Sequence, residues 1–290
     1  MYSGGYLILN GTENRELVFG LIGIDPSRSL SPRIHTIAME KAGIRGIYRT
    51  LPVREEDLAN IVADLRNACI SGINVTIPYK EKIIEFLDSL SEEAKCIGAV
   101  NTVAREDERI VGYNTDCPGF LKSLDDAGIQ VNERRALVLG SGGAARAVCY
   151  GLLTRGVGSL TVASRNLKRA ESIVGSDLYR RAGVILKALT LSDRALAEEV
   201  TEAELIINTT PLGSGSLPGR SPLPDTCSPS AGQAVIDIVY EPPTTPLLEL
   251  AALCGATTMN GLRMLVHQAL ESLRIWLDVK VDAEYIINRL

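Results

Sequence analysis

Three small residues in one short turn give the strongest chemical signal in this chain of 290 residues. Gly140, Gly142 and Ala145 have the spacing G-x-G-x-x-A and follow the uncharged apolar run 136–139. In dinucleotide-binding folds the first glycine permits a tight turn, the second lets the backbone approach a pyrophosphate, and a small third residue lets strand and helix pack closely. The helical pattern at 144–153 would point free N–H groups and a partial positive charge at the phosphates. The pattern predicts a dinucleotide site.

The end of the next predicted strand, 158–164, indicates which dinucleotide binds. An acidic residue at this place would bind the adenosine ribose. The chain instead has Ser164 and Arg165, with Arg169 one helical turn further on. Guanidinium groups bind a 2′-phosphate in bidentate geometry and stack on adenine, whereas an acid would repel the phosphate. The arginines therefore predict NADP rather than NAD, and the alternative is that both are solvated charges at the start of a helix.

Composition limits the class of protein. The length suits about two domains, and an apolar share of 46% is enough for two hydrophobic cores. The formal charge of −5 has mixed signs along the chain, which argues against a nucleic-acid surface. We also expect no signal peptide and no membrane span, because no apolar run has the required length. An anionic substrate or cofactor must then be attracted by local positive charge.

Cysteine and histidine usage favours a cytoplasmic enzyme without a metal. The six cysteines are far apart and form no C-x-x-C pair, as is typical of reduced, mostly buried thiols. The two histidines, His35 and His267, are far apart in sequence, which disfavours a histidine metal site. We therefore expect a cytoplasmic location and no metal ion.

Alternating strand and helix patterns predict an α/β fold with two domains. We expect a first α/β domain over 1–115, a Rossmann-type dinucleotide domain over 116–259, and a mainly helical tail, 260–290, that returns to the first domain. The strands expected in the first domain are 17–23, 46–53, 72–78, 99–104 and 109–113, with helices at 32–42, 55–67 and 80–87. The strands expected in the second are 136–139, 158–164, 204–210 and 234–240, with helices at 144–153 and 246–254.

Two segments have little regular pattern. Residues 1–16 are rich in small polar residues and are predicted to form a loosely held extension without an assigned role. Residues 211–231 are rich in Gly, Pro and Ser, and a loop of this length is usually a mobile flap or disordered.

Several motifs along the chain together resemble the shikimate dehydrogenase family. They run in the family's order from about residue 19 to the C-terminus, which makes the match far more specific than the glycine turn alone. The motifs are SLSP at 29–32, NVTIPYK at 74–80, GAVNT at 98–102, NTD at 114–116, GSGGAA at 140–145, NTT at 208–210 and MLVHQA at 264–269. The resemblance implies reduction of 3-dehydroshikimate to shikimate with NADPH, on the route to chorismate and aromatic amino acids. It also implies an active site in the cleft between two α/β domains.

The resemblance makes Lys80 and Asp116 the catalytic pair. Reduction of a ring ketone needs a hydride on one face and a proton donor at the oxygen. Lys80 would donate this proton in the reducing direction and accept it in the reverse, while Asp116 would bind the same oxygen. Without the resemblance, Lys80 would be interpreted as a solvated charge in Lys80-Glu81-Lys82, and Asp116 as the N-cap of a helix beginning at Pro118.

The same resemblance implies two groups of binding residues. Ser29 and Ser31 resemble the hydroxyls that bind the substrate carboxylate, although alone they would be turn and cap residues. The positions that would contact substrate hydroxyls are Thr76, Asn101, Tyr240 and Gln268. Together with the turn pattern, the positions that would bind NADP are Gly140, Ser141, Gly142, Gly143, Ala144, Ala145, Ser164, Arg165, Arg169, Thr209, Ile238 and Gly261.

The chain departs from the family pattern near the first serine. Arg28 stands where the family usually has His, and Pro26 lies one place later than the usual proline. Tyr79 replaces the commoner Phe. The extra guanidinium could strengthen anion binding or face solvent, so the exact substrate stays open while the reaction type does not.

Two other functions stay open at this stage. A quinate/shikimate or aminoshikimate dehydrogenase would use the same fold, and a pocket for quinate must accommodate an added hydroxyl. A non-catalytic NADP-binding regulator would also use it, but such a protein would be free to lose Lys80 and Asp116. The partners expected are a small-molecule substrate and NADP, with no nucleic acid and no membrane, and the chain could be a monomer or a homodimer.

Overall fold

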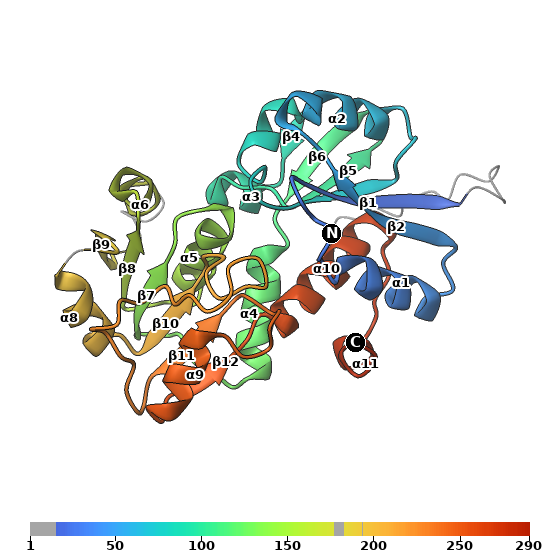
Figure 1. The fold of residues 1–290 in the computed structure, drawn as a ribbon. Coiled ribbons are helices and arrows are strands. Elements are labelled where there is room, and N and C mark those ends of the chain that lie inside the picture. Colours follow the sequence, from blue (N-terminus) through green and yellow to red (C-terminus); the bar gives the residue numbers. More distant parts are fainter. Residues whose placement is uncertain (1–15, 177–182, 193) are drawn as a thin grey trace.

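The computed structural model describes residues 16–176, 183–192 and 194–290. Within these residues the strands form two six-stranded sheets, which agrees with the predicted two-domain α/β fold (Figure 1). The extension expected at 1–16 lies outside the described residues except for Glu16. No helix in the described part of the chain is long and apolar enough to cross a membrane.

The first sheet has the strand order β2-β1-β3-β5-β6-β4. Its strands are β1 (Leu17–Gly23), β2 (Gly46–Pro52), β3 (Gly72–Val75), β4 (Ser89–Leu90), β5 (Thr102–Glu106) and β6 (Arg109–Tyr113). β1 pairs in parallel with β2 and β3, whereas β5 runs antiparallel to β3 and β6. α2 (Leu58–Arg66) covers one face, and α1 (Ser31–Lys41) packs on the other.

The second sheet is entirely parallel and has the order β12-β11-β10-β7-β8-β9. Its strands are β7 (Arg135–Leu139), β8 (Ser159–Ser164), β9 (Ile185–Thr190), β10 (Leu205–Asn208), β11 (Ala234–Asp237) and β12 (Thr257–Met259). α5 (Gly143–Thr154) and α6 (Leu167–Val174) cover one face, and α8 (Ala195–Glu202) and α9 (Pro246–Leu253) cover the other. Because helices cover both faces, the inner strands β10 and β11 are buried along their whole length.

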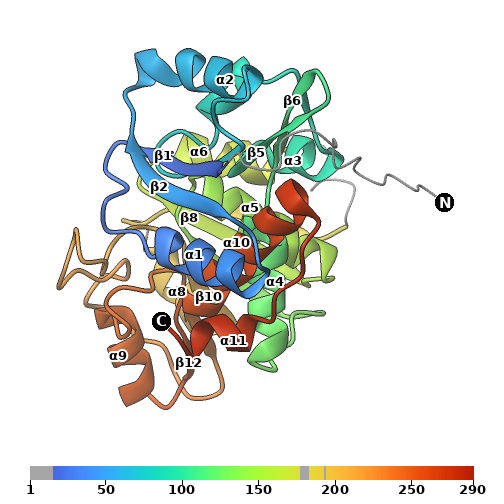
Figure 2. The ribbon, with the colours of Figure 1, turned by 90° about the vertical axis from the view of Figure 1, so that its right-hand side faces the viewer.

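Two helices connect the sheets. α4 (Asp116–Asp126) leads from the first sheet into the second, and α10 (Leu262–Leu277) packs along it. They approach closely at Gly119, where a Cβ atom would lie 2.8 Å from the backbone nitrogen of Gln268. α10 also shares a hydrophobic core with α1 and β1 and passes beside α1 (Figure 2). The C-terminal segment, which ends in α11 (Ala283–Ile287), therefore lies against the first sheet.

Several predicted element boundaries are wrong. β3 ends at Val75, and the helix expected at 80–87 is a short 3-10 segment, η2 (Lys82–Phe86), so Lys80 lies in a turn between strand and helix. α1 begins at Ser31, one residue before Pro32. α4 begins at Asp116 instead of Pro118, so Asp116 is the first helical residue and not the N-cap.

The loop 211–231 has no regular helix or strand, but it is not a free flap. Leu223 and Cys227 are buried in the core beneath α8 and α9. Burial of these side chains offsets the cost of ordering the loop, which its Gly, Pro and Ser content alone did not indicate. β4, α3 (Glu92–Ile97), β9, α8 and β12 have no counterpart in the sequence-based prediction, because each is short or only partly buried.

His35 lies in the core between α1 and the first sheet. Its side chain is fully buried, and its ring stacks on Tyr48 with centroids 4.0 Å apart. Burial lowers the pKa of His35 to about 3, and an interaction with Asn74 opposes part of this shift. The histidine therefore stays neutral in the folded chain at pH values where an unfolded chain would bind a proton.

This difference predicts acid sensitivity. Between pH 6.5 and 4 the unfolded chain binds a proton at His35 and the folded chain does not, so the free energy of unfolding falls as the pH falls, by up to about 1.4 kcal/mol per pH unit. His35→Phe, which keeps a flat ring against Tyr48, should remove this contribution to the slope. Denaturant unfolding at several pH values measures it, with His267→Gln as the control. Parallel curves for wild type and His35→Phe would contradict the prediction.

Candidate functional site

Lys80 and Asp116 form an ion pair where the turn after β3 meets the start of α4. The Lys80 Nζ atom lies 2.5 Å from Asp116 Oδ2, and the two side chains are only 15% and 6% exposed. Lys80 comes from the turn after β3, and Asp116 is the first residue of α4. Two residues far apart in the sequence thus place an amine and a carboxylate at one sheltered point, as a general acid–base site requires.

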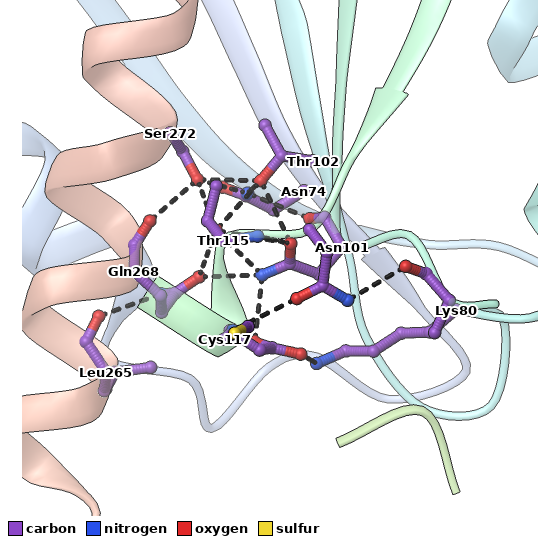
Figure 3. Close-up of polar contacts among 12 residues, drawn as sticks. Asn74, Lys80, Asn101, Thr102, Thr115, Cys117, Leu265, Gln268 and Ser272 are labelled. Carbon is purple, nitrogen blue, oxygen red and sulfur yellow. Dashed lines mark hydrogen bonds and ion pairs between the residues drawn. The ribbon is translucent and has the colours of Figure 1, made fainter. Parts of the chain in front are cut away.

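Asn101 holds the second carboxylate oxygen. Its Nδ2 lies 2.9 Å from Asp116 Oδ1, 2.9 Å from Thr115 Oγ1 and 3.2 Å from Gln268 Oε1. Its Oδ1 accepts a hydrogen bond of 2.6 Å from the Thr115 backbone N–H. Asn101 and Gln268, both predicted site residues, therefore lie together (Figure 3), and Asn101 also contacts Asp116.

A buried layer of polar side chains supports this group, and sequence reasoning missed it. Asn74 Nδ2 donates to the Asn101 carbonyl, Thr102 Oγ1 and Ser272 Oγ, each at 3.0 Å. Tyr48 donates to Asn74 Oδ1 at 2.7 Å. The available signal was a polar side chain within the apolar strand β3, and Ser272 one helical turn after Gln268 on the inward face of α10.

Ser29 and Ser31 lie together at the start of α1. The Ser29 Oγ is 3.0 Å from Ser31 Oγ and accepts a hydrogen bond of 3.1 Å from the Ser31 backbone N–H. Burial raises the pKa of the nearby Tyr48, and an interaction with Ser31 opposes part of this rise. Thr76 is half-buried after β3, and its methyl group fills the space beside Gly23 at the end of β1. These hydroxyls lie at the carboxyl ends of β1 and β3 or at the start of α1.

The glycine turn lies directly against Lys80. Gly140 has φ +119°, and a Cβ there would lie 2.4 Å from Thr209 Oγ1. A Cβ on Gly143 would lie 2.8 Å from Lys80 Cβ. At Gly142, in contrast, a Cβ would meet no other atom within 4 Å. Protein atoms thus lie close to Gly140 and Gly143, whereas the space at Gly142 is open. Gly142 precedes the first turn of α5, so a phosphate could approach the backbone there.

Arg169 of α6 contacts the glycine turn. Ser141 accepts hydrogen bonds through its carbonyl from Arg169, at 3.4 Å from Nε and 3.2 Å from Nη2. Ala145 is buried and Ala144 is partly exposed at the start of α5. The Ser164 hydroxyl is buried in the turn before α6, where it donates to the Asn166 carbonyl. Both the glycine turn and the segment after β8 are therefore held by hydrogen bonds within the described residues.

The ends of β10 and β11 meet through a buried aspartate that the sequence analysis did not select. Asp237 accepts from Asn208 Nδ2, Thr245 Oγ1 and the Val239 N–H at 2.9, 2.7 and 3.0 Å. Burial raises the pKa of Asp237 to about 6, and these hydrogen bonds lower it in part. An acidic residue at the end of an apolar strand was the available signal. The contacts fix the backbone that continues into Thr209 and Ile238.

Gly261 lies against Ile238. A Cβ on Gly261 would lie 2.0 Å from the Ile238 carbonyl oxygen, so only glycine fits there. Thr209 donates through its hydroxyl to the Leu139 carbonyl at 2.8 Å. Across residues 16–176, 183–192 and 194–290, Arg165 and Tyr240 make no hydrogen bond or ion pair with another predicted site residue.

Arg28 makes a hydrogen bond with a distant backbone carbonyl, which neither alternative from the sequence included. Its Nη1 donates to the Gly215 carbonyl at 2.8 Å, although the side chain is exposed. Gly215 belongs to the loop 211–231, so the contact ties the turn before α1 to the second half of the chain. The guanidinium is thus engaged with a backbone carbonyl.

The chemistry available at this junction is acid–base chemistry beside an open backbone cradle. An amine, a carboxylate and several hydroxyls converge near a glycine turn and a helix N-terminus. In the part of the chain that the structure describes, no group of three or more His, Cys, Asp or Glu side chains is arranged to hold a metal ion.

Known proteins are similar to this chain in both sequence and fold. A family model described as "Shikimate dehydrogenase substrate binding domain" matches residues 21–103, and one described as "Shikimate 5'-dehydrogenase C-terminal domain" matches residues 261–290. A protein named Shikimate dehydrogenase (NADP(+)) from Caldanaerobacter subterraneus subsp. tengcongensis is 38% identical over 273 residues, which cover 94% of this chain and 96% of that protein.

Two further matches agree with these. A protein of the same name from Geobacter metallireducens is 42% identical over 260 residues, covering 89% of this chain and 90% of that protein. The crystal structure of shikimate 5-dehydrogenase from Thermus thermophilus, in complex with NADP(H) and shikimate, superposes with a TM-score of 0.82 at 35% identity. This superposition covers 94% of this chain and 97% of the other.

Proposed function

The chain belongs to the shikimate dehydrogenase family, and we propose that it reversibly reduces 3-dehydroshikimate to shikimate with NADPH, in the shikimate pathway. The observation that carries this proposal is the sheltered ion pair between Lys80 and Asp116, which lies against Gly143 of the glycine turn. A proton donor and a dinucleotide cradle side by side are what reduction of a ketone by a nicotinamide requires.

The residues of the cradle fit NADP. The free space at Gly142, the N-terminus of α5 and the guanidinium of Arg169 beside the turn suit a pyrophosphate and a 2′-phosphate. When bound, this cofactor supplies the hydride. We assign the pyrophosphate to the turn 140–145, the adenosine 2′-phosphate to Ser164, Arg165 and Arg169, and the nicotinamide end to Thr209, Ile238 and Gly261.

Lys80 and Asp116 divide the acid–base work. In the reducing direction Lys80 donates a proton from Nζ to the ketone oxygen, and in the reverse direction it accepts one. Asp116 holds the amine at 2.5 Å, and in the alcohol form it accepts a hydrogen bond from the hydroxyl at the same substrate oxygen. Asn101 fixes Asp116 through the other carboxylate oxygen, so the pair keeps its geometry while the proton moves.

The substrate is held by the polar side chains around this pair. Ser29 and Ser31 bind the carboxylate at the N-terminus of α1, where the positive end of the helix dipole favours an anion. The ring hydroxyls bind to Thr76, Asn101, Tyr240 and Gln268. The buried hydrogen bonds around Asn101 and Gln268 limit side-chain motion and favour one orientation of the substrate.

This function divides the chain into two working parts. Residues 1–115 and 260–290 bind substrate, and residues 116–259 bind NADP. The core shared by α10, α1 and β1 supports the return of the C-terminal segment. The enzyme acts in the cytoplasm on a small-molecule substrate, without nucleic acid or a membrane, as a monomer or homodimer.

Initial rates with each substrate and cofactor test the activity. We expect turnover with shikimate and NADP, followed by absorbance of the reduced nicotinamide. We expect a kcat/KM at least roughly tenfold lower with NAD, because Arg169 beside the turn suits a 2′-phosphate, and also with quinate, because its added hydroxyl must be accommodated. Comparable rates with quinate or NAD would indicate a quinate/shikimate dehydrogenase. Tight binding of both ligands without turnover would indicate a regulator on the same fold.

Replacement of the lysine tests the acid–base assignment. Lys80→Met keeps the length of the side chain but removes the proton donor, so kcat should fall by about 10²-fold or more while the affinity for NADP changes little. Lys82→Met is the matched control, because Lys82 pairs with Glu55 at an exposed site. Near-wild-type turnover of Lys80→Met would show that another group moves the proton.

Two neighbouring glycines separate cofactor binding from the position of the lysine. Gly142→Ala meets no protein atom within 4 Å, so it should leave stability almost unchanged but weaken NADP binding by about tenfold or more, because the methyl group occupies the phosphate space. Gly143→Ala would push a methyl group onto Lys80 and should lower kcat instead. Binding titrations and initial rates on both variants measure this. Equal effects of the two variants on NADP affinity would contradict the assignment.

A further inference from the structure

Glu81, the residue after Lys80, makes two ion pairs with the second half of the chain. Its Oε1 lies 2.5 Å from Arg169 Nη2, and its Oε2 lies 3.3 Å from Arg146 Nε. Glu81 precedes η2 beside the first sheet, whereas Arg146 lies in α5 and Arg169 in α6. A carboxylate from one part of the molecule thus occupies two guanidinium groups of the other, close to the glycine turn.

The two arginines are held differently. Arg169 donates a hydrogen bond to Glu81 and also contacts the Ser141 carbonyl. Arg146 faces Glu81 through an Nε atom that makes no hydrogen bond, so this contact is electrostatic, and its Nη2 donates to Ser172 Oγ at 3.1 Å. The side chains of Glu81, Arg146 and Arg169 are 34%, 20% and 47% exposed, so a ligand can reach this group.

The position of Arg169 gives it two possible anionic partners. It is the guanidinium that we assigned to the 2′-phosphate of NADP, and its Nη2 is already committed to Glu81. A phosphate placed there would also meet the negative charge of the carboxylate at close range, which costs free energy. Arg146 gives Glu81 a second cation, so the carboxylate keeps a partner when Arg169 turns toward a phosphate.

We propose that Glu81 competes with the 2′-phosphate of NADP for Arg169 and thereby limits the preference of this chain for NADP over NAD. The proposal rests on the assignment of Arg169 to the 2′-phosphate under the proposed function. NAD lacks this phosphate and leaves the Glu81–Arg169 pair intact, so Glu81 affects the two cofactors unequally. Because Glu81 is bonded to Lys80 in the chain, the exchange of partners also connects the adenosine end of the cofactor with the turn that carries the proton donor.

Dissociation constants for NADP and NAD, measured by titration calorimetry on the full chain, test this proposal. In Glu81→Gln the ratio of NAD to NADP dissociation constants should rise about fivefold, which is the effect of one partly exposed ion pair, while NAD affinity changes less than about twofold. Glu55→Gln is the matched control, since it removes the same charge from an exposed pair with Lys82 and should leave the ratio unchanged. A melting curve of each variant checks that the fold is retained, and Glu81→Asp, which withdraws the carboxylate by one methylene, gives a second variant with a smaller rise in the ratio.

A double variant tests whether Glu81 acts through Arg169. If Glu81 acts by occupying Arg169, the rise in the ratio should disappear when Glu81→Gln is made in an Arg169→Gln background. A rise of equal size in that background, an unchanged ratio, or weaker NADP binding in Glu81→Gln would overturn the proposal. If the wild-type chain itself shows no preference for NADP, the assignment of the cofactor under the proposed function fails instead.

Discussion

The turn that carries Lys80 packs on the first residue of α5, at a place where a side chain on Gly143 would collide with the lysine. This close approach brings Lys80, to which we assigned the role of proton donor, from the first sheet to the glycine turn of the second. The other end of the lysine is fixed by Asp116 at the start of α4. Elements that belong to different sheets therefore share one point, and the chemistry requires all of them to keep their relative positions.

A layer of buried hydrogen bonds keeps these positions. Asn74 and Asn101 contact the strand β5, the helix α10 and the residues at the start of α4 through side-chain amides. Buried amides without partners would be costly, so displacing any one element would leave donors or acceptors unpaired. Tyr48 donates to Asn74 Oδ1 and so belongs to the same layer. The polar layer is thus part of the fold and part of the site.

Arg28 and Glu81 also make contacts with distant parts of the chain, outside this layer. Arg28 reaches the Gly215 carbonyl, and Glu81 reaches Arg146 and Arg169. Both contacts start from turns beside the first sheet, and both end on segments next to the second. Because they are partly exposed, each contributes little to stability.

The sequence by itself determined the α/β class, the strand, glycine turn and helix around 136–153, and, through its motifs, the family. These features depend on local patterns, namely apolar runs, small residues and the order of short motifs. It did not determine that Lys80 lies in a turn before a 3-10 segment, that Asp116 begins α4, or that the loop 211–231 is packed. Only the tertiary structure decided these, together with the buried roles of Asn74, Ser272 and Asp237 and the ion pairs of Glu81. The physical reason is that burial, hydrogen-bond partners and neighbouring charges are set by residues far away in the chain, which no local pattern contains.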